Sequence, residues 1–125
     1  MRRPITTGAP PAAPYSPAIV ASGPLVFVSG QLPVDPATGR PGGGGFGEQA
    51  ARVFEQLTHL LVAAGSGWPH VVKLTVLLAD LRDYAGFNEV SRRWLVEPYP
   101  ARTTAQSALP PGVLLEVDCI AVVPP

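Results

Sequence analysis

The sequence contains only one cysteine, Cys119, and few charged residues. A single thiol cannot form an internal disulfide and lacks the second thiol of a cysteine metal site. This is typical of proteins from a reducing compartment, and we expect the cytoplasm. Only 14% of the residues are charged, and nine Lys and Arg balance nine Asp and Glu. Because no broad positive field is available to attract a polyanion, we expect neither nucleic acid nor an anionic membrane as a partner.

Long hydrophobic runs and cofactor motifs are also missing. Lys73, Thr75 and Asp80 interrupt the most apolar stretch before it reaches the roughly 18 to 20 residues of a membrane span. No apolar segment follows Arg2 and Arg3, as a secretory signal requires. No phosphate-binding G-K-[ST] motif exists, and we interpret His59 and His70 as surface residues and not as metal ligands. We therefore expect neither a metal nor an organic cofactor.

Proline and glycine divide the 125 residues into the short elements of a single domain. We expect residues 1–13 to form an extended N-terminal arm, because prolines near its end remove backbone donors and favour extended conformations. Two strands should follow at 18–21 and 25–29, joined as a hairpin by the turn Ser22-Gly23-Pro24. Five glycines in 41–47 predict a loop before the first helix.

Hydrophobic periodicity predicts the remaining elements. A helix with one buried face is expected over 48–64, with Gly65 as its stop and with apolar residues at positions 50, 53, 54, 57, 60, 61 and 64. A strand should follow at 71–78, and a second helix from Tyr84 to about Leu95. The last two strands are expected over 102–108 and 114–123. The order ββαβαββ predicts an α+β domain with two helices on one face of a mixed sheet.

The last predicted strand has two unlike faces. Leu115, Val117 and Cys119 alternate with Glu116 and Asp118. The apolar face should meet the two helices, where Cys119 is a small buried thiol. The opposite face combines carboxylates with apolar residues, which neither a core nor a plain solvent face explains. A subunit interface that encloses a wet cavity is our hypothesis for that face.

Several motifs together resemble the Rid (RidA/YjgF) family of reactive-intermediate deaminases. The most specific pair is Pro-Ala-Arg-Thr-Thr-Ala at 100–105 with Leu-Leu-Glu-Val-Asp at 114–118. Val-Ser-Gly-Gln at 28–31, Val-Lys-Leu-Thr-Val at 72–76 and Phe-Asn-Glu-Val at 87–90 extend the match over most of the chain. The resemblance implies a chorismate-mutase-like fold that assembles as a barrel-like homotrimer with sites between subunits. It also implies hydrolysis of 2-imino acids to 2-keto acids and ammonia without a metal or an organic cofactor.

The resemblance also implies roles for individual residues. Arg102 matches the arginine that binds the substrate carboxylate, and Glu116 matches the acidic residue that directs the attacking water. The chain departs from the family at Thr104, where a cysteine is common, and this leaves substrate preference open. The full set of expected substrate-binding residues is Arg102, Tyr15, Ser29, Gly30, Thr104 and Asn88, and the expected catalytic residues are Glu116 and Arg102.

Elementary chemistry supports the two central roles. A guanidinium can hold both carboxylate oxygens in parallel hydrogen bonds, and a carboxylate can accept a proton from water and supply one to the departing nitrogen. Each residue also has a structural interpretation, because Arg102 or Glu116 can form an interface ion pair and Tyr15 can simply anchor the arm. Two functional alternatives stay open: an enzyme that acts on a larger imine or enamine, and a non-catalytic regulator that binds small carboxylates.

Overall fold

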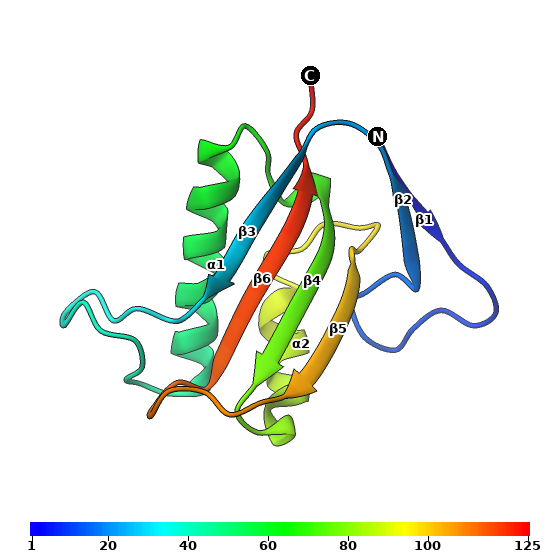
Figure 1. Cartoon of the computed structure of the whole chain (residues 1–125). Coiled ribbons are helices and arrows are strands. Elements are labelled where there is room, and N and C mark those ends of the chain that lie inside the picture. The colour runs from blue at the N-terminus through cyan, green and yellow to red at the C-terminus, as the bar shows by residue number, and fades with distance from the viewer.

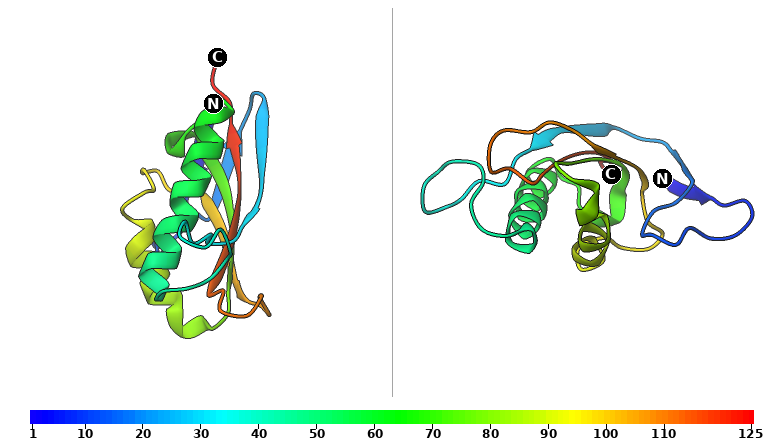
Figure 2. Two further views of the ribbon diagram at one scale, coloured as in Figure 1. Left: turned by 90° about the vertical axis from the view of Figure 1, so that its left-hand side faces the viewer. Right: turned by 90° about the horizontal axis from the view of Figure 1, so that it is seen from below.

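A four-stranded mixed sheet forms one layer of the protein, and two helices form the other. The computed structural model describes all 125 residues. The sheet has the order β3-β6-β4-β5, in which β6 runs antiparallel to both neighbours and β4 is parallel to β5. Both helices cover the same face of this sheet (Figures 1 and 2), which confirms the predicted α+β architecture. The elements are β3 (Leu25–Gln31), α1 (Phe46–Ala63), β4 (Val71–Leu78), α2 (Tyr84–Ser91), β5 (Ala101–Gln106) and β6 (Leu115–Val122).

The predicted hairpin near the N-terminus is wrong. β2 (Ala18–Ala21) pairs with β1 (Arg2–Ile5), a strand within the predicted extended arm, and these two strands form a separate sheet. Ser22 continues that ladder, since its N–H donates to the Met1 carbonyl at 2.9 Å. Pro24 belongs to the other sheet, because its carbonyl accepts from the N–H of Val123 at 2.8 Å. The intervening turn therefore carries the chain from one sheet to the other and does not close a hairpin.

The core lies between α1 and the helix-facing side of the sheet. α1 begins at Phe46, two residues before the predicted start, and five of its seven predicted apolar positions are fully buried: Ala50, Val53, Phe54, Leu57 and Leu61. The Phe54 ring lies 5.4 to 5.9 Å from the rings of Trp68, Phe87 and Trp94. Gly65 has φ +80° and ends the helix, as predicted.

The second helix is shorter than predicted. A 3-10 turn, η2 (Leu81–Asp83), precedes α2, and Asp80 caps it by accepting from the N–H of Arg82 at 2.9 Å. After Ser91 the backbone tightens, because the N–H groups of Arg93 and Trp94 bond three residues back. The chain then turns toward β5 through Glu97-Pro98, where a helix cannot continue. A second 3-10 turn, η1 (Trp68–His70), precedes β4.

The other face of the sheet has no helix over it (Figure 2). The alternation predicted for β6 is confirmed: Leu115, Val117 and Cys119 are buried toward the helices, and Glu116 and Asp118 lie between them on the open face. Large apolar side chains are also exposed there or close by, since Phe27 of β3 is 70% exposed. None of the helices is long and apolar enough to cross a membrane.

Candidate active site

Arg102 lies on β5 and points toward the helices. It is in register with Leu74 of β4, which is fully buried on that side of the sheet. Three aromatic rings surround its guanidinium carbon, at 5.5 Å for Tyr15, 5.3 Å for Tyr84 and 5.4 Å for Phe87, measured to the ring centroids. These distances are in the range of cation–π contacts. Aromatic rings from α2 and from the segment before β2 therefore hold the cation.

The guanidinium has no ion pair within the chain. Its two terminal nitrogens, Nη1 and Nη2, are buried and make no hydrogen bond. The three ion pairs of the chain, Arg52–Glu48, Arg82–Asp80 and Arg93–Glu89, do not include it. Burial lowers the pKa of the Arg102 guanidinium from its ordinary value, and the nearby hydroxyl of Tyr84 first, then that of Tyr15, act in the opposite direction. Arg102 therefore has no ion-pair partner within its own chain.

Two neighbouring polar groups also lack partners. Only five buried side-chain nitrogen and oxygen atoms in the chain make no hydrogen bond, and four of them belong to Asn88, Arg102 and Thr104. Thr104 lies two residues after Arg102 and on the same face of β5. Asn88 lies one turn after Tyr84 on α2 and so shares its helix face. Buried polar groups without partners are costly, and their concentration at one place makes it the candidate binding site.

Backbone contacts with the start of β5 place Tyr15 beside Arg102. The N–H of Ser16 donates to the Pro100 carbonyl at 3.0 Å, and Ser16 forms a bridge with Ala101. The Ser16 hydroxyl also donates to the carbonyl of Tyr99. The proline-rich segment is thus fixed at its end, and the Tyr15 ring lies against the guanidinium.

Glu116 lies on the open face of the sheet. It is in register with Leu77 of β4, one step out of phase with the buried residues of that strand. Close to it, β3 contains a bulge between Val28 and Gln31, so that two residues, Ser29 and Gly30, face the single residue Asp118 of β6. A Cβ on Gly30 would lie only 2.1 Å from Glu116 Oε2. The bulge and the missing side chain of Gly30 therefore leave the space that this carboxylate occupies.

The predicted site residues form two groups that one chain does not bring together. One of them, the Arg102 group, lies on the helix side near the edge strand β5 and consists of Arg102, Thr104, Tyr15 and Asn88. The other group lies on the open face, on strands β3 and β6, and consists of Ser29, Gly30 and Glu116. That these groups share one crevice stays a prediction, and within one chain the sheet separates them.

Sequence reasoning did not assign two residues that contact Arg102. The sequence places Tyr84 and Phe87 in the second helix and assigns neither a role in the site, yet their rings cover the guanidinium. A signal was present, since Tyr84, Phe87 and Asn88 have the i, i+3, i+4 spacing of a single helix face. The sequence did not show that this face lies against Arg102.

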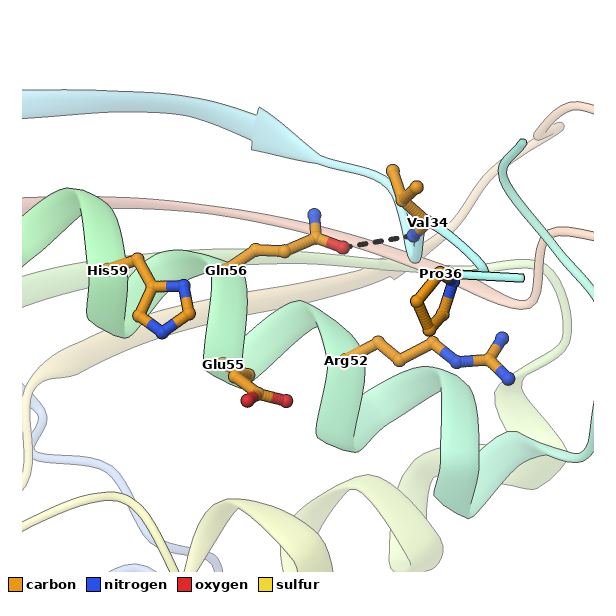
Figure 3. Close-up of a pocket in the computed structure, with 6 residues that line it drawn as sticks. All are labelled: Val34, Pro36, Arg52, Glu55, Gln56 and His59. Carbon is orange, nitrogen blue, oxygen red and sulfur yellow. Dashed lines mark hydrogen bonds between the residues drawn. The ribbon is translucent and has the colours of Figure 1, made fainter. Parts of the chain in front are cut away.

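The surface has two hollows. One lies away from the predicted site residues, and the other borders Tyr15. One of about 270 Å³ lies along the outer side of α1 and includes Arg52, Glu55 and His59. Figure 3 shows that these three side chains extend in different directions, while Gln56 accepts a hydrogen bond from the N–H of Val34 at 2.9 Å. This hollow along α1 contains none of the predicted site residues. The other hollow, of about 320 Å³, lies beside Tyr15, between the N-terminal segment and residues 97–99.

Cys119 offers no reactive thiol. Its side chain is buried between the sheet and the helices, and it makes no disulfide. Burial first, and Asp118 second, raise the pKa of this thiol to about 12. Because the thiolate is the nucleophilic form, the residue is inert at neutral pH.

Comparisons with known proteins agree with the architecture and the motifs. A family model described as endoribonuclease L-PSP matches residues 6–123. The chain is 48% identical to the protein DfrA of Myxococcus xanthus, over 87% of this chain and 85% of that protein. It is 41% identical to the 2-iminobutanoate/2-iminopropanoate deaminase of Capra hircus, over 98% of this chain and 90% of that protein. The crystal structure of RidA from an Antarctic Psychrobacter superposes with a TM-score of 0.75 at 42% identity, covering 96% of this chain and 93% of that one. The chain therefore belongs to the Rid (RidA/YjgF) family, which confirms the resemblance carried by its motifs.

Proposed function

We propose that the chain is an enamine/imine deaminase that hydrolyses reactive 2-imino acids to 2-keto acids and ammonia. One observation carries the proposal: a buried guanidinium with two unpartnered nitrogens, held by aromatic rings, is ready to receive a carboxylate. Relatives that bear the name of this activity, such as the Capra hircus protein, match the chain over nearly its whole length. The cytoplasm is the proposed compartment, since the single thiol forms no disulfide.

Arg102 binds the substrate carboxylate in this proposal. A 2-imino acid has a planar carboxylate next to an electrophilic C=N carbon, and Nη1 and Nη2 can donate to its two oxygens in parallel. The hydroxyl of Thr104 and the amide of Asn88, whose oxygens lack partners, complete the polar wall of this group. Anchoring of the carboxylate fixes the position of the C=N carbon, which reduces the entropic cost of the attack by water.

Glu116 directs the water. Its carboxylate accepts a proton as the water oxygen bonds to the C=N carbon, and the C=N double bond becomes a C–N single bond. The same proton is then delivered to the nitrogen, which gives an amino alcohol. The carboxylate next accepts the hydroxyl proton as the C=O bond of the 2-keto acid forms, and it passes this proton to the nitrogen as the C–N bond breaks, so that ammonia leaves. In this proposal Ser29, which is exposed near the end of β3, hydrogen-bonds the water or the nitrogen. No external oxidant, reductant or metal is needed for this balance.

A second copy of the chain completes the site. Since one chain holds Arg102 and Glu116 on opposite faces of its sheet, the open face of one subunit must meet the Arg102 group of its neighbour. Uncovered apolar side chains support burial of the open face, because Phe27 is 70% and Leu25 46% exposed. A head-to-tail contact of this kind closes into a ring, and we propose a homotrimer with three sites between subunits.

The first test is imine hydrolysis. A threonine dehydratase generates 2-iminobutanoate in situ, and its loss is followed with the wild type, Arg102→Ala and Glu116→Ala. We expect the wild type to accelerate hydrolysis, and each variant to lose at least about 100-fold in kcat/KM. Arg93→Ala and Glu89→Ala are matched controls, since Glu89 of α2 and Arg93, just after the helix, form an exposed ion pair, and both should retain activity. A wild type that leaves the spontaneous rate unchanged contradicts the proposal for small substrates.

The second test asks whether two chains share a site. Arg102→Ala and Glu116→Ala are mixed in equal amounts, dissociated and reassembled. In a ring where each site takes Arg102 from one subunit and Glu116 from the next, about a quarter of the sites recover both groups. Activity should therefore return to about a quarter of the wild-type value, and light scattering should give a trimer. A mixture without activity, from variants that still form trimers, contradicts the shared site.

The hollow beside Tyr15 favours a second candidate, an enzyme for a larger imine or enamine. The volume of about 320 Å³ adjoins a ring that contacts Arg102, and Thr104 departs from the usual cysteine. A panel of imines with increasing side-chain size decides between the two candidates, since a kcat/KM that rises with size supports the larger substrate. RNA cleavage is not proposed, because a chain of zero net charge lacks the basic surface that RNA binding needs.

A further inference from the structure

Tyr84, like Phe87, contacts the Arg102 guanidinium and has no role in the proposed reaction. It is the first residue of α2, it is 38% exposed, and its ring centroid lies 5.3 Å from the guanidinium carbon of Arg102. The Tyr15 and Phe87 rings lie at similar distances. Phe87 is fully buried and belongs to the core, whereas Tyr84 and Tyr15 are only partly buried and lie on the solvent side of the guanidinium.

Local contacts fix the place of the Tyr84 ring. The 3-10 turn before it is capped by Asp80, and the N–H of Leu81 donates to the side-chain oxygen of Gln106 at 2.9 Å. Gln106 ends β5, the strand that carries Arg102. The start of α2 is therefore tied to the same strand as the arginine, and the ring and the guanidinium are held by one connected set of contacts.

An arginine without a carboxylate partner needs another means of orientation. A guanidinium on a long side chain has many rotamers, and fixing one of them at binding costs entropy. Aromatic rings over its faces restrict these rotamers and, unlike a carboxylate, they use none of its N–H donors. This agrees with the buried and unpartnered state of Nη1 and Nη2.

We infer that Tyr84 is a positioning residue for Arg102, and that its ring, not its hydroxyl, holds the guanidinium in the orientation that receives a carboxylate ligand. This inference rests on the proposed function only for the identity of the ligand as a small carboxylate. Loss of the ring leaves the guanidinium free to rotate and more hydrated, so the ligand has to restore its orientation on binding. Affinity for the carboxylate falls, while the chemical step at the C=N carbon changes little.

Two substitutions distinguish the effect of the Tyr84 ring from that of its hydroxyl. Tyr84→Phe keeps the ring, and Tyr84→Leu replaces it with an aliphatic side chain that still covers the partly exposed position. Phe46→Leu is the matched control, because Phe46 is also a partly buried aromatic residue at the first position of a helix, and its ring is not one of the three that surround the Arg102 guanidinium. We expect Tyr84→Leu to raise KM for 2-iminobutanoate about tenfold with kcat within about twofold. Tyr84→Phe and Phe46→Leu should keep the wild-type KM.

Binding and spectroscopy give readouts that do not depend on catalysis. Calorimetry with 2-oxobutanoate, a non-reacting carboxylate, should show the same tenfold loss of affinity in Tyr84→Leu alone. In the NMR spectrum, ring currents should shift the Arg102 side-chain protons upfield in the wild type and in Tyr84→Phe, and less so in Tyr84→Leu. If Tyr84→Leu binds 2-oxobutanoate like the wild type, the inference is overturned. Equal losses in Tyr84→Phe and Tyr84→Leu overturn it as well, because the hydroxyl would then be the acting group.

The outcomes also separate this inference from the proposed deaminase activity. A wild type that does not accelerate imine hydrolysis but binds 2-oxobutanoate in a ring-dependent way removes the activity and leaves the positioning role in place. If the wild type hydrolyses the imine and Tyr84→Leu retains full activity, the positioning role is removed and the deaminase activity stays in place.

Discussion

The close approach of Gly30 to Glu116 leads to a quantitative prediction for Gly30→Ala. The added Cβ would lie 2.1 Å from Oε2, 2.9 Å from Cδ and 3.1 Å from Cγ of the glutamate, whereas ordinary contacts begin at 3.4 Å. The carboxylate oxygen must therefore move by about 1.3 Å, the difference between the first and last of these distances. A displacement of about 1 Å in a reacting group can cost about 100-fold in rate. The predicted effect on kcat/KM is a loss of about that size.

Stability should change much less than activity. Gly30 is not among the glycines with positive φ, so alanine can adopt its backbone conformation. The clash is with the end of a flexible side chain on the open face, which can rotate away, and we expect the melting temperature to fall by less than about 5 °C.

The assay is imine hydrolysis, with melting temperature and light scattering measured on the same samples. Gly47→Ala is the matched control, because a Cβ at that position meets nothing within 4 Å. If Gly30→Ala forms the same oligomer as the wild type and retains full kcat/KM, then the position of Glu116 does not limit the reaction and the reasoning is refuted.

Three further predictions concern buried polar groups. Thr104→Val should raise the free energy of unfolding by up to about 1 kcal/mol, since Oγ1 has no partner, and should raise KM several-fold; a lower stability in urea contradicts this. Gln49→Leu should cost about 2 to 4 kcal/mol in urea unfolding, because Gln49 accepts from the N–H of Leu114 and donates to the Gly112 carbonyl, both at 2.9 Å; a loss below about 1 kcal/mol shows that water replaces these bonds. Since the Cys119 thiol has a pKa raised to about 12, it ionises above pH 9 in the unfolded chain before it does in the native one, and its stabilising contribution is lost as pH rises from 9 toward 12. The free energy of unfolding should fall in that window by up to about 1.4 kcal/mol per pH unit from this group, and an equal slope in Cys119→Ala contradicts the assignment.

Patterns that depend on a single face were predictable from the sequence. Residues 71–78 and the first long helix were found because apolar residues repeat with periods that only one kind of element satisfies. The alternation of apolar and acidic residues likewise predicted Cys119 in the core and Glu116 on the opposite face, and both positions are confirmed. Burial of one face is a strong free-energy term, and it leaves a readable pattern in the sequence.

Features that depend on pairing between distant segments were not predictable in this way. The turn Ser22-Gly23-Pro24 is compatible with a hairpin, and only the hydrogen bonds of Met1 and Val123 show that it joins two sheets. The contact of Tyr84 with Arg102 depends in the same way on how α2 lies over β5. The family motifs predicted which residues belong to the site, but they carry no information on which face each residue occupies.

The register of the sheet decides that one chain cannot bring Arg102 and Glu116 together. Both are in register with β4, Arg102 with Leu74 and Glu116 with Leu77. Because side chains alternate along a strand and these two positions differ by an odd number, the two groups must point to opposite sides. A slip by one residue would turn the buried side chains of β4 outward, which the core does not permit. If the reaction needs both groups, activity has to depend on assembly of the subunits. We therefore expect the specific activity to fall on dilution, at the protein concentration where light scattering shows dissociation. A dissociated chain with full activity would show that one of the two groups is not used.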